Sequence, residues 1–236
     1  MKFTPHPKGK FYVSKVLTPQ EANSLSFDGR DYRANNLQYC AGGDPFKANK
    51  TKGNKKSNGG GAVFWGHDPV LDPMNKPISE WKSKRFICTY NHRPPTKEEY
   101  GNDMIMMCIY YGCPMFPEVD VPFLREHFEE KGFGGLLVQF ENSKFDAVAG
   151  VTASKHKQKI FLEYIDYIEF HCEREMHIEL LEEIRDIEDV DDMTNWDLFT
   201  AGGYAMLGIR NYMPQVQHHN NHDTYDISQY LEEFTA

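Results

Sequence analysis

Short apolar runs separated by glycine, proline and asparagine fill the first ninety residues of the chain, and this pattern predicts strands. A first strand is expected over residues 10–17. Three more strands are expected to follow in hairpin fashion, over residues 37–44, 60–66 and 84–91. The first part of the chain is therefore predicted to supply antiparallel-type strands.

The spacing of apolar residues becomes helical after residue 95. Thr96 is expected to cap a helix that runs toward Tyr111, because Glu99 follows three residues later as in a capping box. Gly112 is expected to end this helix. Its apolar residues form a stripe that should be buried: Met104, Met107, Cys108 and Tyr111.

Strands and helices alternate in the next part of the chain. A short strand over 113–117 and a buried strand over 133–140 are predicted on either side of a helix over 121–131. Two helices follow, near 157–171 and 175–187. The apolar residues predicted to line them are Ile160, Tyr164, Ile165 and Ile168 on the first, and Ile178, Leu181 and Ile184 on the second.

A last helix is predicted over residues 198–210, and it is rich in small residues: Ala201, Gly202, Gly203 and Ala205. Small side chains allow a helix to lie close against a sheet. The order of all these elements is typical of the RNase H-like α/β fold, a mixed five-stranded central sheet with helices on both faces. We expect one such domain over 37–210, an N-terminal lead-in with a strand over 1–36, and a polar C-terminal tail over 211–236.

Composition agrees with a soluble globular protein. The chain has 236 residues, 26% of them charged and 40% hydrophobic, which fits one large domain or two small ones. Its five cysteines lack the spacing of a zinc site and are expected to be reduced thiols of a cytoplasmic protein. A glycine run at 59–61 is not followed by Gly-Lys-Ser/Thr, so the sequence has no Walker A motif.

The net charge of −9 argues against general nucleic-acid binding. Two clusters of lysines nevertheless provide local positive charge, and we expect them to contact a phosphate backbone. The alternative for each cluster is an ordinary solvated loop. The candidate DNA-binding residues are Lys47, Lys50, Lys52, Lys55 and Lys56 in one loop, and Lys155, Lys157 and Lys159 in the other cluster.

Asp44 lies at the end of the most strand-like run of the first part of the chain, in the sequence Gly-Gly-Asp-Pro at 42–45. Two glycines permit close approach of another backbone, and the proline ends the strand. A carboxylate in this setting suits a divalent cation such as Mg²⁺, which takes oxygen ligands. The alternative is a simple turn, for which this sequence is also favourable.

Two more acidic residues follow the ends of predicted elements. Glu118 comes directly after the strand over 113–117, and Asp197 lies in the first turn of the last helix. In an RNase H-like sheet these two residues and Asp44 share one rim. Each of the two is also explained as an acid favoured near a helix N-terminus. Together, three carboxylates with two divalent ions form the arrangement of a two-metal nuclease.

The chain resembles the C-terminal nuclease domain of the large terminase subunit of tailed phages. The match runs from about residue 37 to 210. It is carried by Gly-Gly-Asp-Pro at 42–45, His-Arg-Pro-Pro-Thr-Lys-Glu-Glu at 92–99, Cys-x-x-Tyr at 108–111, Glu-Val-Asp at 118–120, Gly-Val-Thr at 150–152 and Asp-x-x-x-Ala at 197–201.

This resemblance implies an endonuclease that depends on Mg²⁺ or Mn²⁺ and cuts concatemeric double-stranded viral DNA during packaging. Asp44, Glu118 and Asp197 are the implied catalytic metal ligands, with two ions. The implied partners are the terminase ATPase domain, the small terminase subunit and the portal protein, and the implied location is the cytoplasm of the infected bacterium. The sequence contains no ATPase domain, so we expect an excised domain or a separately encoded nuclease.

Alternatives remain for the third ligand and for the function. Many family members carry two adjacent aspartates at the helix, whereas Asp197 stands between Trp196 and Leu198, and the pair at 191–192 is an alternative ligand source. A RuvC-like resolvase or transposase-type nuclease would use the same carboxylates. A non-catalytic RNase H-like docking module is the alternative of a different class. Histidines at 218, 219 and 222 are expected to be solvated rather than metal ligands.

Overall fold

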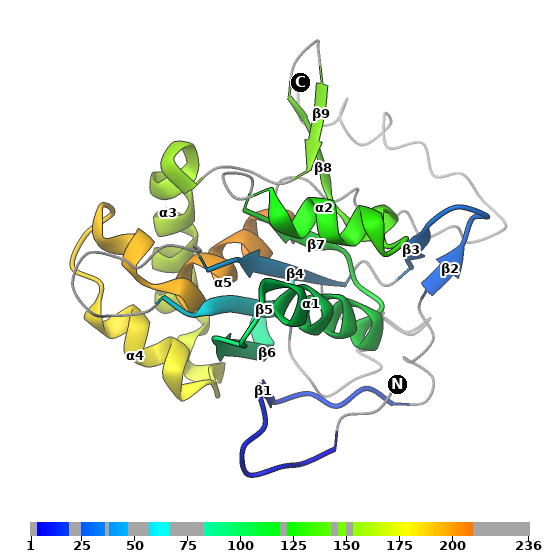
Figure 1. Cartoon of the computed structure of the whole chain (residues 1–236). Helices are drawn as coiled ribbons and strands as arrows, with labels where there is room; N and C mark the ends of the chain where they lie inside the picture. The colour runs from blue at the N-terminus through cyan, green and yellow to red at the C-terminus, as the bar shows by residue number, and fades with distance from the viewer. Residues whose placement is uncertain are drawn as a thin grey trace, which may run out of the picture.

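The computed structural model of the chain describes residues 4–18, 25–35, 38–46, 57–66, 83–118, 122–142, 146–149 and 153–209. These residues form a mixed α/β structure around a five-stranded mixed sheet (Figure 1). None of the helices in these parts of the chain combines the length and the apolar character that a membrane span requires.

The central sheet has the strand order β1-β6-β5-β4-β7. Its strands are β1 (Phe11–Val13), β6 (Arg85–His92), β5 (Gly59–Trp65), β4 (Tyr39–Asp44) and β7 (Met115–Pro117). Neighbouring strands are antiparallel except for β4 and β7, which are parallel. The three strands predicted over 37–44, 60–66 and 84–91 are therefore confirmed. The strand predicted over 10–17 is shorter and forms an edge of the same sheet.

Helix α1 (Lys97–Tyr111) begins and ends where the sequence predicts. The hydroxyl of Thr96 accepts the N–H of Glu99 at 3.1 Å, and Gly112 ends the helix with a left-handed φ of 61°. The predicted apolar stripe is fully buried. The carboxylate of Glu99, which a capping box would turn back to Thr96, instead lies 2.6 Å from the ammonium group of Lys10.

Helix α2 (Phe123–Glu130) follows β7 and packs beside α1. The buried strand predicted over 133–140 is wrong in its first half, because Gly134–Leu136 form a 3₁₀ turn, η1. Gly135 lies so close to the carbonyl oxygen of Tyr32 that a Cβ atom would press against it. Beyond β7 the sheet continues as a parallel bridge between Leu137 and Met115. The N–H of the next residue, Val138, donates to the carbonyl oxygen of Met115 at 2.8 Å.

Helix α5 (Asp197–Leu207) lies directly against β4 and β5. A Cβ atom on Gly42 would collide with the carbonyl oxygen of Ala201, and one on Gly60 would collide with that of Asp197. The prediction that small residues bring this helix close to a sheet is confirmed, although glycines of the sheet contribute as much as the helix does.

The opposite face of the sheet is covered by α1 and α2. Gly43 follows Gly42 in β4 and therefore faces the other way, toward Leu124 of α2 and Tyr100 of α1. Figure 1 shows α1 in front of the strands and α5 behind them. Helices thus cover both faces of the sheet, as the sequence predicts.

Helix α3 (Ala153–His171) packs on α5 and leads through η2 (Cys172–Arg174) into the next segment. Its burial differs from the prediction. Ile160 and Tyr164 are buried as expected, but Ile165 and Ile168 are 44% and 41% exposed. Tyr167 is buried instead, with its ring 5.5 Å from that of Phe86. The rings of Tyr164 and Phe199 stack at 3.8 Å, which fixes the face that α3 presents to α5.

In helix α4 (Ile178–Asp186), too, the buried residues differ from those predicted. A 3₁₀ turn, η3 (Asp192–Asn195), lies between α4 and α5. The burial of Ile178 and Leu181 is wrongly predicted, since both are exposed, while Ile184 packs against the core as expected. Leu180 is fully buried in their place.

Two hairpins outside the central sheet were not predicted. One pairs β2 (Leu25–Phe27) with β3 (Tyr32–Ala34), and the other pairs β8 (Gln139–Asn142) with β9 (Asp146–Ala149). Figure 1 shows the β8–β9 hairpin extending away from the body of the domain.

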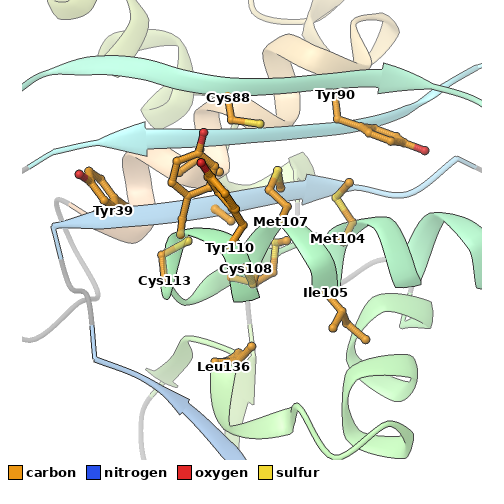
Figure 2. Close-up of a cluster of buried hydrophobic side chains, with 14 of the residues drawn as sticks. Tyr39, Cys88, Tyr90, Met104, Ile105, Met107, Cys108, Tyr110, Cys113 and Leu136 are labelled. Carbon is orange, nitrogen blue, oxygen red and sulfur yellow. The ribbon is translucent and has the colours of Figure 1, made fainter. Parts of the chain in front are cut away.

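Two clusters of buried side chains form the core, one with α1 and α2 and the other with α3, α4 and α5. Figure 2 shows Met104, Met107 and Cys108 of α1 on the side of the helix that faces the sheet, in which β6 carries Cys88 and Tyr90. Of the five cysteines, four are buried and Cys172 is exposed, and none takes part in a disulfide.

Candidate functional site

Asp44 and Glu118 lie at the same rim of the central sheet. Asp44 is the last residue of β4, and Glu118 follows β7, the strand parallel to it. The N–H of Glu118 donates to the carbonyl oxygen of Gly43 at 3.0 Å, which continues the ladder by one residue. Carboxyl ends of parallel neighbours meet at one rim of a sheet, and this is the usual place for a site in an α/β protein. Asp44 is half-buried and Glu118 is buried.

Asp197 reaches this rim from helix α5. It is the first residue of the helix, and its Oδ2 accepts the N–H of Asn58 at 2.7 Å. Asn58 directly precedes β5, and Gly60 of β5 is the pairing partner of Asp44. Since the carbonyl of Asp197 lies against Gly60, the first turn of α5 sits over the start of β5. The three predicted ligands therefore come from three adjacent points of the structure.

Tyr100 of α1 is a common neighbour of the three acids. Its side chain is fully buried, and its hydroxyl donates to the carbonyl oxygen of Gly60 at 2.7 Å. Burial raises the pKa of this hydroxyl, and the nearby carboxylates of Asp44, Asp197 and Glu118 raise it further. All three acids thus lie within electrostatic range of one hydroxyl group.

Tyr100 was not among the residues predicted from the sequence to belong to the site. It lies one turn before Met104, so it extends the predicted apolar stripe of α1 by four residues toward the rim. That spacing was the available signal for its burial. Its hydrogen bond to Gly60 depends on the pairing of α1 with β5 and has no counterpart in the sequence.

The donor chemistry at the rim fits a hard divalent cation. The three side chains offer only carboxylate oxygens, and Mg²⁺ is usually held by one or two carboxylates together with water and substrate phosphate. Among the described residues, no group of three or more histidine, cysteine, aspartate or glutamate side chains is already gathered as a metal site.

Arg93 connects the two ends of the first lysine loop. Its guanidinium lies 4.5 Å from the centre of the Phe46 ring, and it also donates a hydrogen bond to the carbonyl oxygen of Ser57. Next to Ser57, the side chain of Asn58 donates to Asn91 at 2.9 Å. The candidate DNA-binding residues of this loop lie outside the described part of the chain: Lys47, Lys50, Lys52, Lys55 and Lys56. Both ends of the loop are thus fixed beside the carboxylates.

The second lysine cluster lies on α3. The ammonium group of Lys157 is 3.6 Å from a carboxylate oxygen of Asp191. Lys159 is half-buried, and only the backbone of Lys155 is described. Lys157 is therefore already engaged with an acidic side chain before any ligand binds.

The alternative acids at 191–192 have other contacts. Asp192 accepts the indole N–H of Trp196 at 3.1 Å and the amide of Asn195 at 2.7 Å, and these bonds lower the pKa of its carboxyl group. The side chain of Asp191 is 97% exposed. Asp197, rather than this pair, is the acid whose carboxylate accepts the N–H of Asn58 at the start of β5. The histidines at 218, 219 and 222 are outside the described residues.

Glu183 of α4 is a further acidic side chain close to Asp197. Its Oε2 accepts the N–H of Phe199 at 2.7 Å. Burial raises the pKa of the Glu183 carboxyl to about 7, with a further increase from the charge of Asp197, while the N–H groups of Phe199 and Leu198 oppose the rise. Its spacing of three residues from buried Leu180 was the only sequence signal for this position.

These features define a mixed α/β protein with an acidic site at the carboxyl end of its parallel strand pair. Comparison with models of protein families, with curated proteins and with solved structures finds no match for this chain.

Proposed function

We propose that the chain is a divalent-metal-dependent endodeoxyribonuclease with an RNase H-like fold, equivalent to the nuclease domain of a large terminase subunit. The observation that carries this proposal is the placement of Asp44 and Glu118 at one rim of the sheet, with the first turn of α5, which carries Asp197, over the start of β5. Neighbouring carboxylates repel each other without a cation, so such a placement is favoured where a cation is part of the function.

The strand order supports the RNase H-like assignment. Strands β4, β5 and β6 follow one another in antiparallel pairs, and β7 then adds on the other side of β4 in parallel. An isolated parallel bridge joins Leu137 to Met115 on the other side of β7. The first and fourth strands of the predicted order, β4 and β7, thus lie side by side, as expected for an RNase H-like sheet.

In the proposed reaction the protein holds the ions and aligns the phosphodiester. Asp44, Glu118 and Asp197 would hold Mg²⁺ or Mn²⁺, which activates water and stabilises the leaving oxygen in this class of enzyme. The N–H of Asn58 orients the carboxylate of Asp197. The hydroxyl of Tyr100 fixes the backbone of Gly60, the residue between the two aspartates.

The proposed substrate is double-stranded DNA, cut during genome packaging in the cytoplasm of an infected bacterium. Phosphate contacts would come from lysines of the two clusters, with the terminase ATPase domain, small subunit and portal protein as partners. These assignments rest on the resemblance of the sequence motifs.

Cleavage of supercoiled plasmid with Mn²⁺ tests the proposal. We expect the parent protein to nick and linearise the plasmid, and Asp44→Asn to abolish cleavage while its folding is unchanged. Glu182→Gln is the matched control, because it neutralises an exposed acid on α4 outside the cluster, and it should cleave as the parent does. Undiminished cleavage by folded Asp44→Asn would contradict the assignment of Asp44 as a catalytic metal ligand. Preference for a four-way junction over duplex would favour a resolvase instead.

A further inference from the structure

Helix α5 is capped by a side chain from another helix. Its own N-cap residue, Trp196, makes no side-chain capping bond. The carboxylate of Glu183 in α4 instead accepts the N–H of Phe199, the third residue of α5, at 2.7 Å. A carboxylate that receives amide hydrogens at a helix N-terminus makes a charge-assisted bond and also interacts favourably with the helix dipole.

The helix turn that Glu183 caps is the turn that carries Asp197. Asp197 is the first residue of α5, and its side chain is held on the other side by the N–H of Asn58. Two contacts therefore help to hold this carboxylate in place. One comes from the start of β5 and the other, through the backbone of the first turn, comes from α4.

The remainder of α5 is held by different contacts. Ala201 rests against Gly42 of the sheet, and Gly202 and Gly203 lie against Tyr164 and Ile160 of α3. The first turn is held in addition by Phe199, whose ring stacks on that of Tyr164. Leu180, one turn before Glu183, is fully buried and fixes α4 in place. Loss of the Glu183 carboxylate should therefore loosen the first turn of α5 without releasing the helix.

We infer that Glu183 is a positioning residue for the metal site, which acts by holding the first turn of α5 so that Asp197 faces Asp44 and Glu118. This inference rests on the proposed function. Residues that orient metal ligands from behind commonly change metal affinity by 10–100-fold when they are replaced. Glu183 has such a position, because it binds the backbone of the helix turn that carries Asp197.

A titration with Mn²⁺ alone, followed by thermal unfolding, tests the inference without using catalysis. The variants are Glu183→Ala, which removes the acceptor, Glu183→Gln, which keeps an acceptor oxygen without the charge, and Glu182→Ala. Glu182 is the matched control because it is the exposed neighbour on the same helix. The measured quantity is the Mn²⁺ concentration that gives half of the maximal rise in melting temperature.

We expect this midpoint to rise about tenfold in Glu183→Ala and about threefold in Glu183→Gln, and to be unchanged in Glu182→Ala. A merely structural cap would lower the melting temperature without Mn²⁺ and leave the midpoint where it is. Should Glu183→Ala fail to fold, an unchanged midpoint in Glu183→Gln would overturn the inference.

The two proposals fail in different ways. If Mn²⁺ does not raise the melting temperature of the parent protein, the proposed metal site is wrong, and so is the proposed role of Glu183. If the parent responds and both Glu183 variants respond at the same midpoint, only the positioning role is wrong.

Discussion

The amide of Glu118 and the carbonyl oxygen of Gly43 are joined by a hydrogen bond of 3.0 Å. Through this bond the chain leaving β7 is fixed to the end of β4, one residue before Asp44. The backbones that carry the first two acids of the site are therefore parts of one sheet. Asp197 is the acid whose place depends on the packing of a helix.

Divalent cations should stabilise the folded protein, because they relieve the repulsion among the three acids and bind only the native state. We expect millimolar Mn²⁺ to raise the melting temperature of the parent. The rise should be smaller in Glu118→Gln, in which one carboxylate is neutral. Glu182→Gln, at an exposed position on α4, serves as the control and should respond as the parent does. The absence of a shift in the parent would contradict a cation site formed by these acids.

Replacement of Tyr100 by Phe should destabilise the domain by about 1–3 kcal/mol, because the buried carbonyl oxygen of Gly60 loses its donor. Urea unfolding measures this change. Tyr12→Phe is a suitable control, since Tyr12 is 54% exposed in the edge strand β1. Equal stability of the two variants would show that the hydrogen bond of Tyr100 contributes nothing.

Gly60→Ala should be among the most harmful single substitutions, because its Cβ atom would meet the carbonyl of Asp197 and push α5 from the sheet. We expect a loss of at least about 2 kcal/mol of stability, together with weaker Mn²⁺ binding. Gly134→Ala is the comparison, since there the nearest atom is in the flexible side chain of Glu129 at 3.3 Å. A Gly60→Ala protein as stable as this control would mean that α5 does not lie against β5.

Affinity for duplex DNA should fall steeply with salt, and neutralisation of the loop lysines should flatten that dependence. Each lysine that no longer binds a phosphate should reduce the slope of log affinity against log salt by about 0.9. The variant replaces Lys52, Lys55 and Lys56 by Gln. Lys8→Gln, at an exposed position elsewhere, is the control. If the triple variant keeps the slope and affinity of the parent, this loop does not bind DNA.

Local signals account for what the sequence predicted well. The ends of α1 follow from Thr96 and Gly112, whose chemistry acts within one turn of the chain. Local signals also predicted the strands of the central sheet, except at its edges. There the pairing of Phe11 to Val13 with β6 depends on a partner distant in sequence.

The buried face of each helix was harder to predict, because the spacing of apolar residues is compatible with more than one buried face. Spacing alone favours Ile165 and Ile168 as much as Tyr167. The choice is made by aromatic partners on other elements, such as Phe86. The roles of Tyr100 and Glu183 were not predicted for a related reason. Tyr100 binds Gly60 and Glu183 binds Phe199, and these pairs come into contact only in the folded chain.

The contacts of Arg93 with Phe46 and Ser57 bear on how much change the chain tolerates between them. The ends of this segment are held by the scaffold, and closing a longer loop between fixed ends costs only about 0.6 kcal/mol for each doubling of its length. Insertions between residues 47 and 56 should therefore leave Asp44 and Asp197 where they are. The span between Phe46 and Ser57 is thus a natural place to insert a foreign peptide without moving the strands that flank it.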